Sequence, residues 1–209
     1  MSRPYVVVVS SEKGGVGKTT LATNLAIYLK ALHEDLPVTL CSFDNHFSVD
    51  QMFRINKRTN GKGDVVSLFN GGRPDHLVET GEFGVQFIPS NNDLASTHQN
   101  LDGPDILARK LSESDLSGIL IIDTRPVLDI FTQNALFCAD RVIVPVKDAP
   151  SLENCKHLYH FFDDHGLGTG QKFDEAFFLH RKIRQQQVMV DDNEVRFLRG
   201  LARFDNMTL

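Results

Sequence analysis

A glycine-rich loop between an apolar run and an amphipathic segment most limits how this chain can fold. The run YVVVVS at 5–10 leads into SSEKGGVGKTT at 10–20, and apolar residues at helical spacing follow through 19–33. Glycines let the backbone curl so that successive N–H groups point inward, and the N-terminus of a following helix adds its positive dipole end. Strand, loop and helix in this order predict an anion-binding unit.

The loop differs at one position from the phosphate-binding pattern G-x-x-x-x-G-K-[ST], because Glu12 stands where the first glycine is expected. Lys13 follows it, so the loop carries a second cation besides Lys18. Lys18 is placed to reach the β and γ phosphates of ATP, or the β phosphate of ADP, and the Thr19 hydroxyl is placed to ligate Mg²⁺. The residues expected to bind nucleotide include Gly14, Gly15, Val16, Gly17, Lys18, Thr19 and Thr20, with Thr20 beside the α phosphate. The alternative, a glycine turn with chance lysines, does not explain the flanking segments.

Short apolar runs bounded by turn residues recur along the chain. They lie at 5–10, 38–43, 85–90, 118–123, 141–146 and 175–180. Because these runs lack polar alternation, they predict strands covered on both faces, as in a parallel sheet. Helical spacing at 19–33 and at 151–162, the latter with Ser151 as N-cap, predicts helices between strands. The expected fold class is α/β, a doubly wound, mainly parallel sheet with flanking helices and with loops at 56–64 and 70–74.

Length and composition fit one well-cored domain. The chain has 209 residues, of which 41% are hydrophobic, so we expect a single domain over 1–209 with 181–209 as a basic tail.

The net charge of −5 argues against a wholly basic nucleic-acid binder and leaves a local basic patch open. Three widely spaced cysteines are too few for a disulfide framework, and no apolar run approaches the ~20 residues of a membrane span. We therefore expect a cytoplasmic protein.

The stretch KGGVGKTT resembles the deviant Walker A loop of the ParA/MinD ATPases, in which an extra lysine is a signature of the group. The resemblance implies that two subunits sandwich two ATP molecules, and that each signature lysine crosses to the partner's phosphates. Lys13 is that lysine here, which makes it a nucleotide-binding and catalytic residue of an ATP-dependent homodimer, beside Lys18. A cation supplied in trans would stabilise the charge that develops in phosphoryl transfer. A solvated surface lysine is the alternative.

Two further stretches supply acidic residues at strand ends. ILIIDTRP offers Asp123, which is expected to hold Mg²⁺ together with Thr19. It resembles the family's D-x-P-P, with Arg125 in place of the first proline. SFDNHF resembles the family's D-x-D, with Ser42 in place of the first acid and Asp44 matching the second, which the resemblance implies is catalytic and positions the attacking water. Loss of the first acid predicts slow hydrolysis.

The resemblance covers about residues 4–162 and fades beyond them, so the C-terminal part looks shortened. In Glu194–Phe204, Arg196, Arg199 and Arg203 fall within about 60° of one another on a helical wheel, opposite an apolar arc. This basic amphipathic helix could lie on a membrane, as MinD helices do, or along DNA phosphates. The plainer alternative is a final helix packed on the sheet with its arginines in water.

The resemblance implies a ParA-like ATPase that acts as a nucleotide-dependent dimerisation switch and positions or segregates DNA or another cargo. It would hydrolyse ATP to ADP and phosphate, slowly without a ParB-like activating protein, and would associate with the nucleoid through non-specific DNA. A MinD-like positioning ATPase, peripheral to the membrane, is the alternative. No substrate-site motif supports a metabolic enzyme on the same scaffold. The loop lysines and both aspartates are present, which argues against an interaction module with an inactive nucleotide site.

Overall fold

The computed structural model describes most of the chain up to Leu167, and one strand beyond it. The described residues are 3–44, 49, 63–91, 93–94, 101–148, 150–151, 154–167 and 177–179. The basic tail predicted at 181–209 and most of the loop predicted at 56–64 lie outside this part, so the domain limits stay a prediction. None of the helices in the described part has the length and apolar character needed to cross a bilayer.

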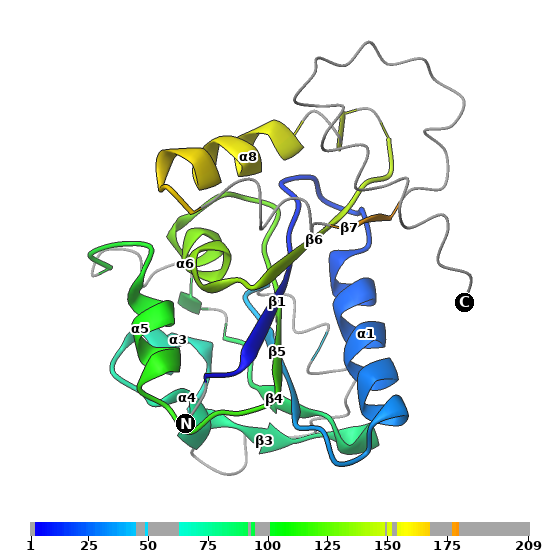
Figure 1. Cartoon of the computed structure of the whole chain (residues 1–209), viewed down its shortest axis with the longest axis vertical. Coiled ribbons are helices and arrows are strands. Elements are labelled where there is room, and N and C mark those ends of the chain that lie inside the picture. Colours follow the sequence, from blue (N-terminus) through cyan, green and yellow to red (C-terminus); the bar gives the residue numbers. More distant parts are fainter. Residues whose placement is uncertain are drawn as a thin grey trace.

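A seven-stranded sheet runs through the centre of the described part (Figure 1). Its strands are β1 (Tyr5–Val9), β2 (Val38–Ser42), β3 (Glu79–Thr80), β4 (Gln86–Ile88), β5 (Ile119–Asp123), β6 (Arg141–Pro145) and β7 (Phe177–Leu179). Their spatial order is β3-β4-β2-β5-β1-β6-β7, and every neighbouring pair is parallel except β3 with β4. Each of the six predicted apolar runs contains a strand, which confirms the mainly parallel sheet.

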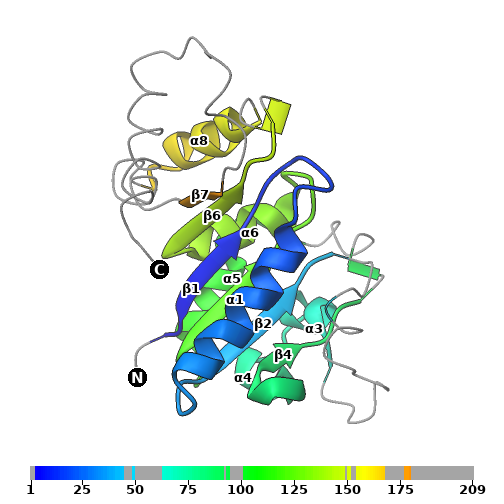
Figure 2. The same cartoon turned by 90° about the vertical axis from the view of Figure 1, so that its right-hand side faces the viewer.

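Helices cover both faces of the sheet. They are α1 (Lys18–Leu32), α3 (Val65–Phe69), α4 (Pro74–Leu77), α5 (Ile106–Ser112), α6 (Ile130–Cys138) and α8 (Cys155–Asp164), with a 3-10 turn, η1 (Glu82–Gly84). The turn residues Asn70–Arg73 precede Pro74, whose fixed φ suits the first position of a helix. Figure 2, turned by 90°, shows α1 in front of the sheet with α5 and α6 behind it.

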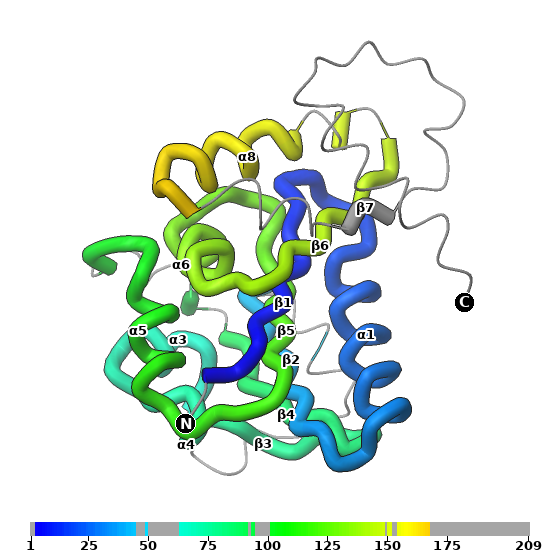
Figure 3. Tube along the Cα trace, in the orientation of Figure 1, coloured from blue at the N-terminus to red at the C-terminus, as the bar shows by residue number. Residues whose placement is uncertain are grey.

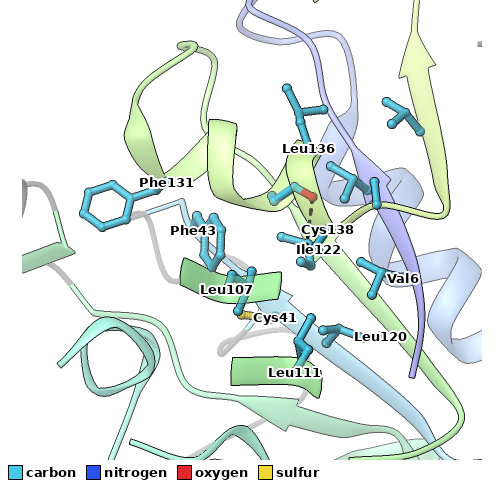
Figure 4. Close-up of a cluster of buried hydrophobic side chains, with 14 of the residues drawn as sticks. Val6, Cys41, Phe43, Leu107, Leu111, Leu120, Ile122, Phe131, Leu136 and Cys138 are labelled. Atoms are coloured by element: carbon cyan, nitrogen blue, oxygen red, sulfur yellow. Dashed lines mark hydrogen bonds between the residues drawn. The ribbon is translucent and has the colours of Figure 1, made fainter. Parts of the chain in front are cut away.

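Successive side chains of a strand point to opposite faces, so the central strands supply two cores. Val6 and Val8 of β1 belong to a cluster with residues of α5, α6 and α8. Val7 and Val9 pack on the other face with residues of α1. Figure 4 shows part of the first cluster, where Leu107 of α5 faces Cys41 of β2. Burial on both faces explains why these strands are continuous apolar runs in the sequence.

The predicted cap at Ser151 is wrong. Helix α8 begins at Cys155, and its N-cap is Asn154, which makes no side-chain capping bond. Ser151 is fully buried instead, and its hydroxyl accepts hydrogen bonds from the backbone N–H groups of Lys147 and Asp148, both at 2.9 Å. The serine therefore closes the turn that follows β6, a role that competes with helix capping.

The register of the central strands brings three segments to one edge of the sheet. Asp123, the last residue of β5, pairs with Val9 of β1 on one side and with Ser42 of β2 on the other. In a parallel sheet the carboxyl ends of adjacent strands meet at the same edge, which is where ligands bind in open α/β folds. The connection from β1 to α1 starts at this edge, beside the segment that leads into α8 (Figure 3).

Candidate functional site

The loop between β1 and α1 presents open backbone at the start of a helix. Gly17 is the N-cap of α1 with φ 91°, and Gly15 has φ 70°, both in the left-handed region that favours glycine. A β-carbon at Gly14, Gly15 or Gly17 would lie in open space, with no heavy atom within 4 Å. The N-terminus of α1 has no side-chain cap and no acidic residue in its first turn. No side-chain cap therefore competes with an anion for the hydrogen bonds that its first N–H groups can donate.

Lys18 lies inside the curl of this loop. Its side chain is buried, and the ammonium donates to the backbone carbonyl of Lys13 at 3.0 Å. Burial lowers the pKa of Lys18, and the nearby carboxylates of Asp123 and Asp44 oppose that shift. The hydrogen bond from the Lys18 ammonium to the carbonyl of Lys13 can be exchanged for one to a phosphate oxygen.

Asp123 is fully buried at the end of β5, with its two oxygens in different environments. Oδ2 accepts from the Thr19 hydroxyl at 2.8 Å and from the Ser42 hydroxyl at 3.1 Å. Oδ1 is buried and has no hydrogen-bond partner among the described residues. Burial raises the pKa of Asp123 to about 6, against the lowering effect of the two hydroxyl bonds.

Thr19 and Asp123 fit the predicted Mg²⁺ site. A buried carboxylate oxygen without a partner, next to a threonine hydroxyl, supplies the hard oxygen donors that Mg²⁺ prefers. Within the described residues, no group of three or more His, Cys, Asp and Glu side chains is gathered to hold an ion alone. Mg²⁺ typically keeps several waters and shares its coordination between one or two protein groups and substrate phosphates, which suits this donor set.

Ser42 joins the two acidic residues of the site. Its hydroxyl donates to Asp123 and accepts from the backbone N–H of Asp44 at 3.3 Å. Asp44 is partly exposed and close enough to Lys18 to act on its pKa. The structure thus brings together Lys18, Thr19, Asp44 and Asp123, which the sequence had placed in one site, while their roles in binding and catalysis stay predictions.

Lys13 does not join that group. Its ammonium turns out of the loop and donates to both carboxylate oxygens of Asp148, at 2.9 and 2.8 Å. The adjacent Glu12 pairs through its carboxylate with Nδ1 of His157 on α8. The sequence prediction missed both partners. Asp148 lies three residues after the end of β6, and a polar residue just past a parallel strand beside β1 was the available signal.

Arg125, which replaces a proline of the family pattern, pairs with Asp129. The guanidinium donates to Asp129 Oδ2 at 3.0 Å, and Asp129 Oδ1 accepts from the Thr132 backbone N–H at 3.0 Å as the N-cap of α6. The segment after Asp123 is therefore tied to the start of α6 by a side-chain pair.

A family model described as an AAA domain matches residues 5–167 of this chain. The chromosome-partitioning ATPase Soj of Thermus thermophilus is 30% identical over 141 residues, which cover 68% of this chain and 54% of Soj. The chromosome partitioning protein ParA of Myxococcus xanthus is 30% identical over 166 residues, which cover 76% of this chain and 58% of that protein. The chain spans about half the length of the curated relatives it matches.

Solved structures agree on the fold. A plasmid partition protein from Borrelia burgdorferi superposes with a TM-score of 0.73 at 21% identity, covering 99% of this chain and 100% of that chain. Cobyrinic acid a,c-diamide synthase from Mycobacterium smegmatis, with a bound ATP analogue and magnesium, gives 0.67 at 23% identity, covering 98% and 83%. Partition proteins and a metabolic synthetase share this architecture, so the fold alone does not choose between them.

Proposed function

Because this chain belongs to the AAA domain family, among the ParA/MinD-like P-loop ATPases, we propose that it is a partitioning ATPase that uses ATP binding as a dimerisation switch. The observation that carries the proposal is that the two lysine side chains of one loop point in different directions. Lys18 lies inside the loop, whereas the Lys13 ammonium points out of it. These two positions support a role for Lys18 at this subunit's own nucleotide and a role for Lys13 at a negative charge outside the loop.

In this proposal the backbone N–H groups of 14–17 and the start of α1 bind the phosphates of ATP. Lys18 leaves the carbonyl of Lys13 to bind the β and γ phosphates, while Thr19 and Asp123 hold Mg²⁺, which when bound neutralises charge on the phosphates. Asp44 orients the attacking water. Ser42, a neutral group where relatives are expected to have an acid, leaves hydrolysis slow until an activating protein binds.

The dimer forms when Lys13 crosses to the phosphates of a second subunit. Nucleotide then controls assembly by mass action, because the crossing lysine needs the partner's phosphates to bind. The dimer would hold non-specific DNA, release it after hydrolysis and respond to a ParB-like protein. The two curated relatives at 30% identity are named for chromosome partitioning, which favours DNA over a membrane as the surface that the dimer binds.

Light scattering of the full chain with ATP, with ADP and without nucleotide tests the switch. We expect dimers only with ATP and Mg²⁺, and we expect Lys13→Ala to remain monomeric while still binding ATP. Lys110→Ala on α5, which removes the same charge away from the loop, should dimerise as the parent chain does. A Lys13→Ala variant that dimerises and hydrolyses ATP normally would contradict the proposal.

Whether the dimer binds DNA or a membrane needs a separate measurement. Retention on non-specific DNA is compared with co-sedimentation on anionic liposomes, each with ATP and with ADP. We expect ATP-dependent retention on DNA that weakens steeply with salt, because released counterions drive such binding. Binding to liposomes without DNA retention would support the membrane-associated alternative instead.

A further inference from the structure

We propose that Glu12 is a positioning residue that fastens the loop between β1 and α1 to helix α8, and that this contact strengthens nucleotide binding by the loop. The contact is the pair between the Glu12 carboxylate and Nδ1 of His157. The proposal rests on the function proposed above, in which the backbone N–H groups of 14–17 bind phosphates. It assigns a role to the residue that stands where the phosphate-binding pattern has its first glycine.

Position 12 does not require a glycine in this loop. Among the described residues, Phe83 is the one non-glycine residue with a positive φ, so the backbone of Glu12 lies outside the left-handed region. Gly15 and Gly17, by contrast, have φ values of 70° and 91°. A side chain can therefore stand at position 12 without backbone strain, while the glycines that follow leave open space beside the loop.

The pair between Glu12 and His157 has a defined direction. Because a carboxylate has only acceptor oxygens, Nδ1 of His157 carries the proton and donates it to Glu12. Glu12 is the more enclosed partner, with a side chain that is 21% exposed against 63% for His157. The two residues lie 145 positions apart in sequence. The pair thus ties the loop to a helix that the backbone reaches only after β6.

The N-terminal turn of α8 is a favourable place for the charge of Glu12. This turn contains no acidic residue, and its N-cap, Asn154, makes no side-chain capping bond. His157 is the third residue of α8, so the pair brings a carboxylate to the positive end of the helix dipole. Cys155, the first residue of α8, senses the same charge, because burial and then Glu12 raise its pKa to about 12. Glu12 therefore supplies the anion that the first turn of α8 lacks.

Fastening the loop reduces the disorder that nucleotide binding has to remove. The end of β1 is already held, because the Ser10 N–H donates to the Ile143 carbonyl of β6 at 3.0 Å. The glycines come next, and glycine loses more conformational freedom on ordering than any other residue. An anchor at Glu12, just before these glycines, restricts the loop in advance. The entropy lost when phosphates order the loop is then smaller, which raises the affinity.

The pair also controls where a negative charge lies. Glu12 is two residues before Gly14, the first residue proposed to bind phosphate. A carboxylate that turned into the loop would repel an anion there. His157 holds this carboxylate on α8 instead. Removal of His157 would release the charge as well as the anchor, so both effects should weaken phosphate binding.

The test is the dissociation constant of ADP with Mg²⁺, measured by calorimetry on the full chain. We expect His157→Ala to weaken binding by about 2- to 5-fold, as loss of a partly exposed pair should. In a Glu12→Ala background the same substitution should change nothing, because its partner has already gone. His160→Ala, which removes another exposed histidine of α8, should bind ADP as the parent chain does. The proposal is overturned if His157→Ala has no effect, or has the same effect when Glu12 is absent.

A second readout separates this inference from the proposed function. Hydrogen exchange of the nucleotide-free chain, followed by mass spectrometry, reports how firmly the loop is held without a ligand. We expect faster exchange at 11–22 in both His157→Ala and Glu12→Ala, and parent rates at 119–123 of β5. Glu12→Gln keeps an oxygen for Nδ1 and should show a smaller change than Glu12→Ala.

The two readouts together distinguish the possible failures. If the parent chain binds no ADP, the proposed function fails, and faster exchange at 11–22 would show that Glu12 still fastens the loop. If ADP binds and neither its affinity nor the exchange responds to His157→Ala, the inference fails and the proposed function stands.

Discussion

The Thr19 hydroxyl donates to Asp123 Oδ2 at 2.8 Å, which joins the first turn of α1 to the end of β5 across 104 residues of sequence. The other carboxylate oxygen is buried without a partner among the described residues, and burial raises the pKa of Asp123. A buried carboxylate with an unsatisfied oxygen destabilises a fold, so its presence is better explained by binding than by stability.

The first prediction concerns stability against pH. Between the ordinary pKa of 3.8 and the raised value of about 6, folded Asp123 keeps a proton that the unfolded chain has lost. Stability should therefore fall as the pH rises through this window, by on the order of 1–3 kcal/mol. Asp123→Asn has no charge to bury and should be more stable than the parent chain at pH 7, but not at pH 4. Urea unfolding from pH 4 to pH 7 measures this, and an equal fall in both chains would contradict it.

The second prediction restores the acid that the family pattern has at position 42. Ser42→Asp would place a second carboxylate beside Asp123, where Ser42 is 3% exposed and its hydroxyl lies 3.1 Å from Oδ2. Because it buries two like charges, the variant should have a lower melting temperature than the parent chain when no ligand is present. Adding Mg²⁺ with ADP should raise the melting temperature of the variant by more than it raises that of the parent chain. Ser42→Ala, which loses the hydrogen bonds without adding charge, should show no such extra gain. An equal gain from Mg²⁺ with ADP in all three chains would show that the metal does not bind here.

The sheet could be predicted from the sequence because strands buried on both faces leave continuous apolar runs, as at 38–43 and 118–123. Helix α1 was visible for a related reason, since its apolar face has a helical period. Helices α3 and α4 and strand β3 were missed, because five, four and two residues are too few to show a period.

Most of the candidate site could also be predicted, since each residue follows an apolar run that ends at the same edge of the sheet. Asp123 and Asp44 are recognisable in this way. The contact of Lys13 with Asp148 was not, because it depends on where a side chain turns after the loop is built. Ser151 was misread for a similar reason: a serine before a helical run predicts a cap, and nothing local indicates that a turn binds it first.

The third prediction separates the two roles of Asp129. Its side chain caps α6 and also pairs with Arg125, and the two side chains are 13% and 21% exposed. Asp129→Ala removes both interactions and should cost about 1–2 kcal/mol of unfolding free energy. Arg125→Ala removes only the pair, and Asp129→Asn keeps an oxygen for the cap, so each should cost less than about 1 kcal/mol. Urea unfolding gives the values. A cost for Arg125→Ala as large as that for Asp129→Ala would mean that Arg125 has a further partner.

The last prediction concerns hydrolysis. Asp44 is partly exposed, beside a buried Lys18 and next to the Ser42 hydroxyl that bonds Asp123. If Asp44 orients the attacking water, Asp44→Ala should bind ATP and dimerise like the parent chain, yet hydrolyse ATP in a single turnover about 10²-fold more slowly or worse. Asp35→Ala, in the exposed turn after α1, removes the same charge away from the site and should hydrolyse normally. Loss of ATP binding together with hydrolysis would assign Asp44 to the nucleotide or its metal instead of the water. Hydrolysis at the parent rate would remove it from the reaction.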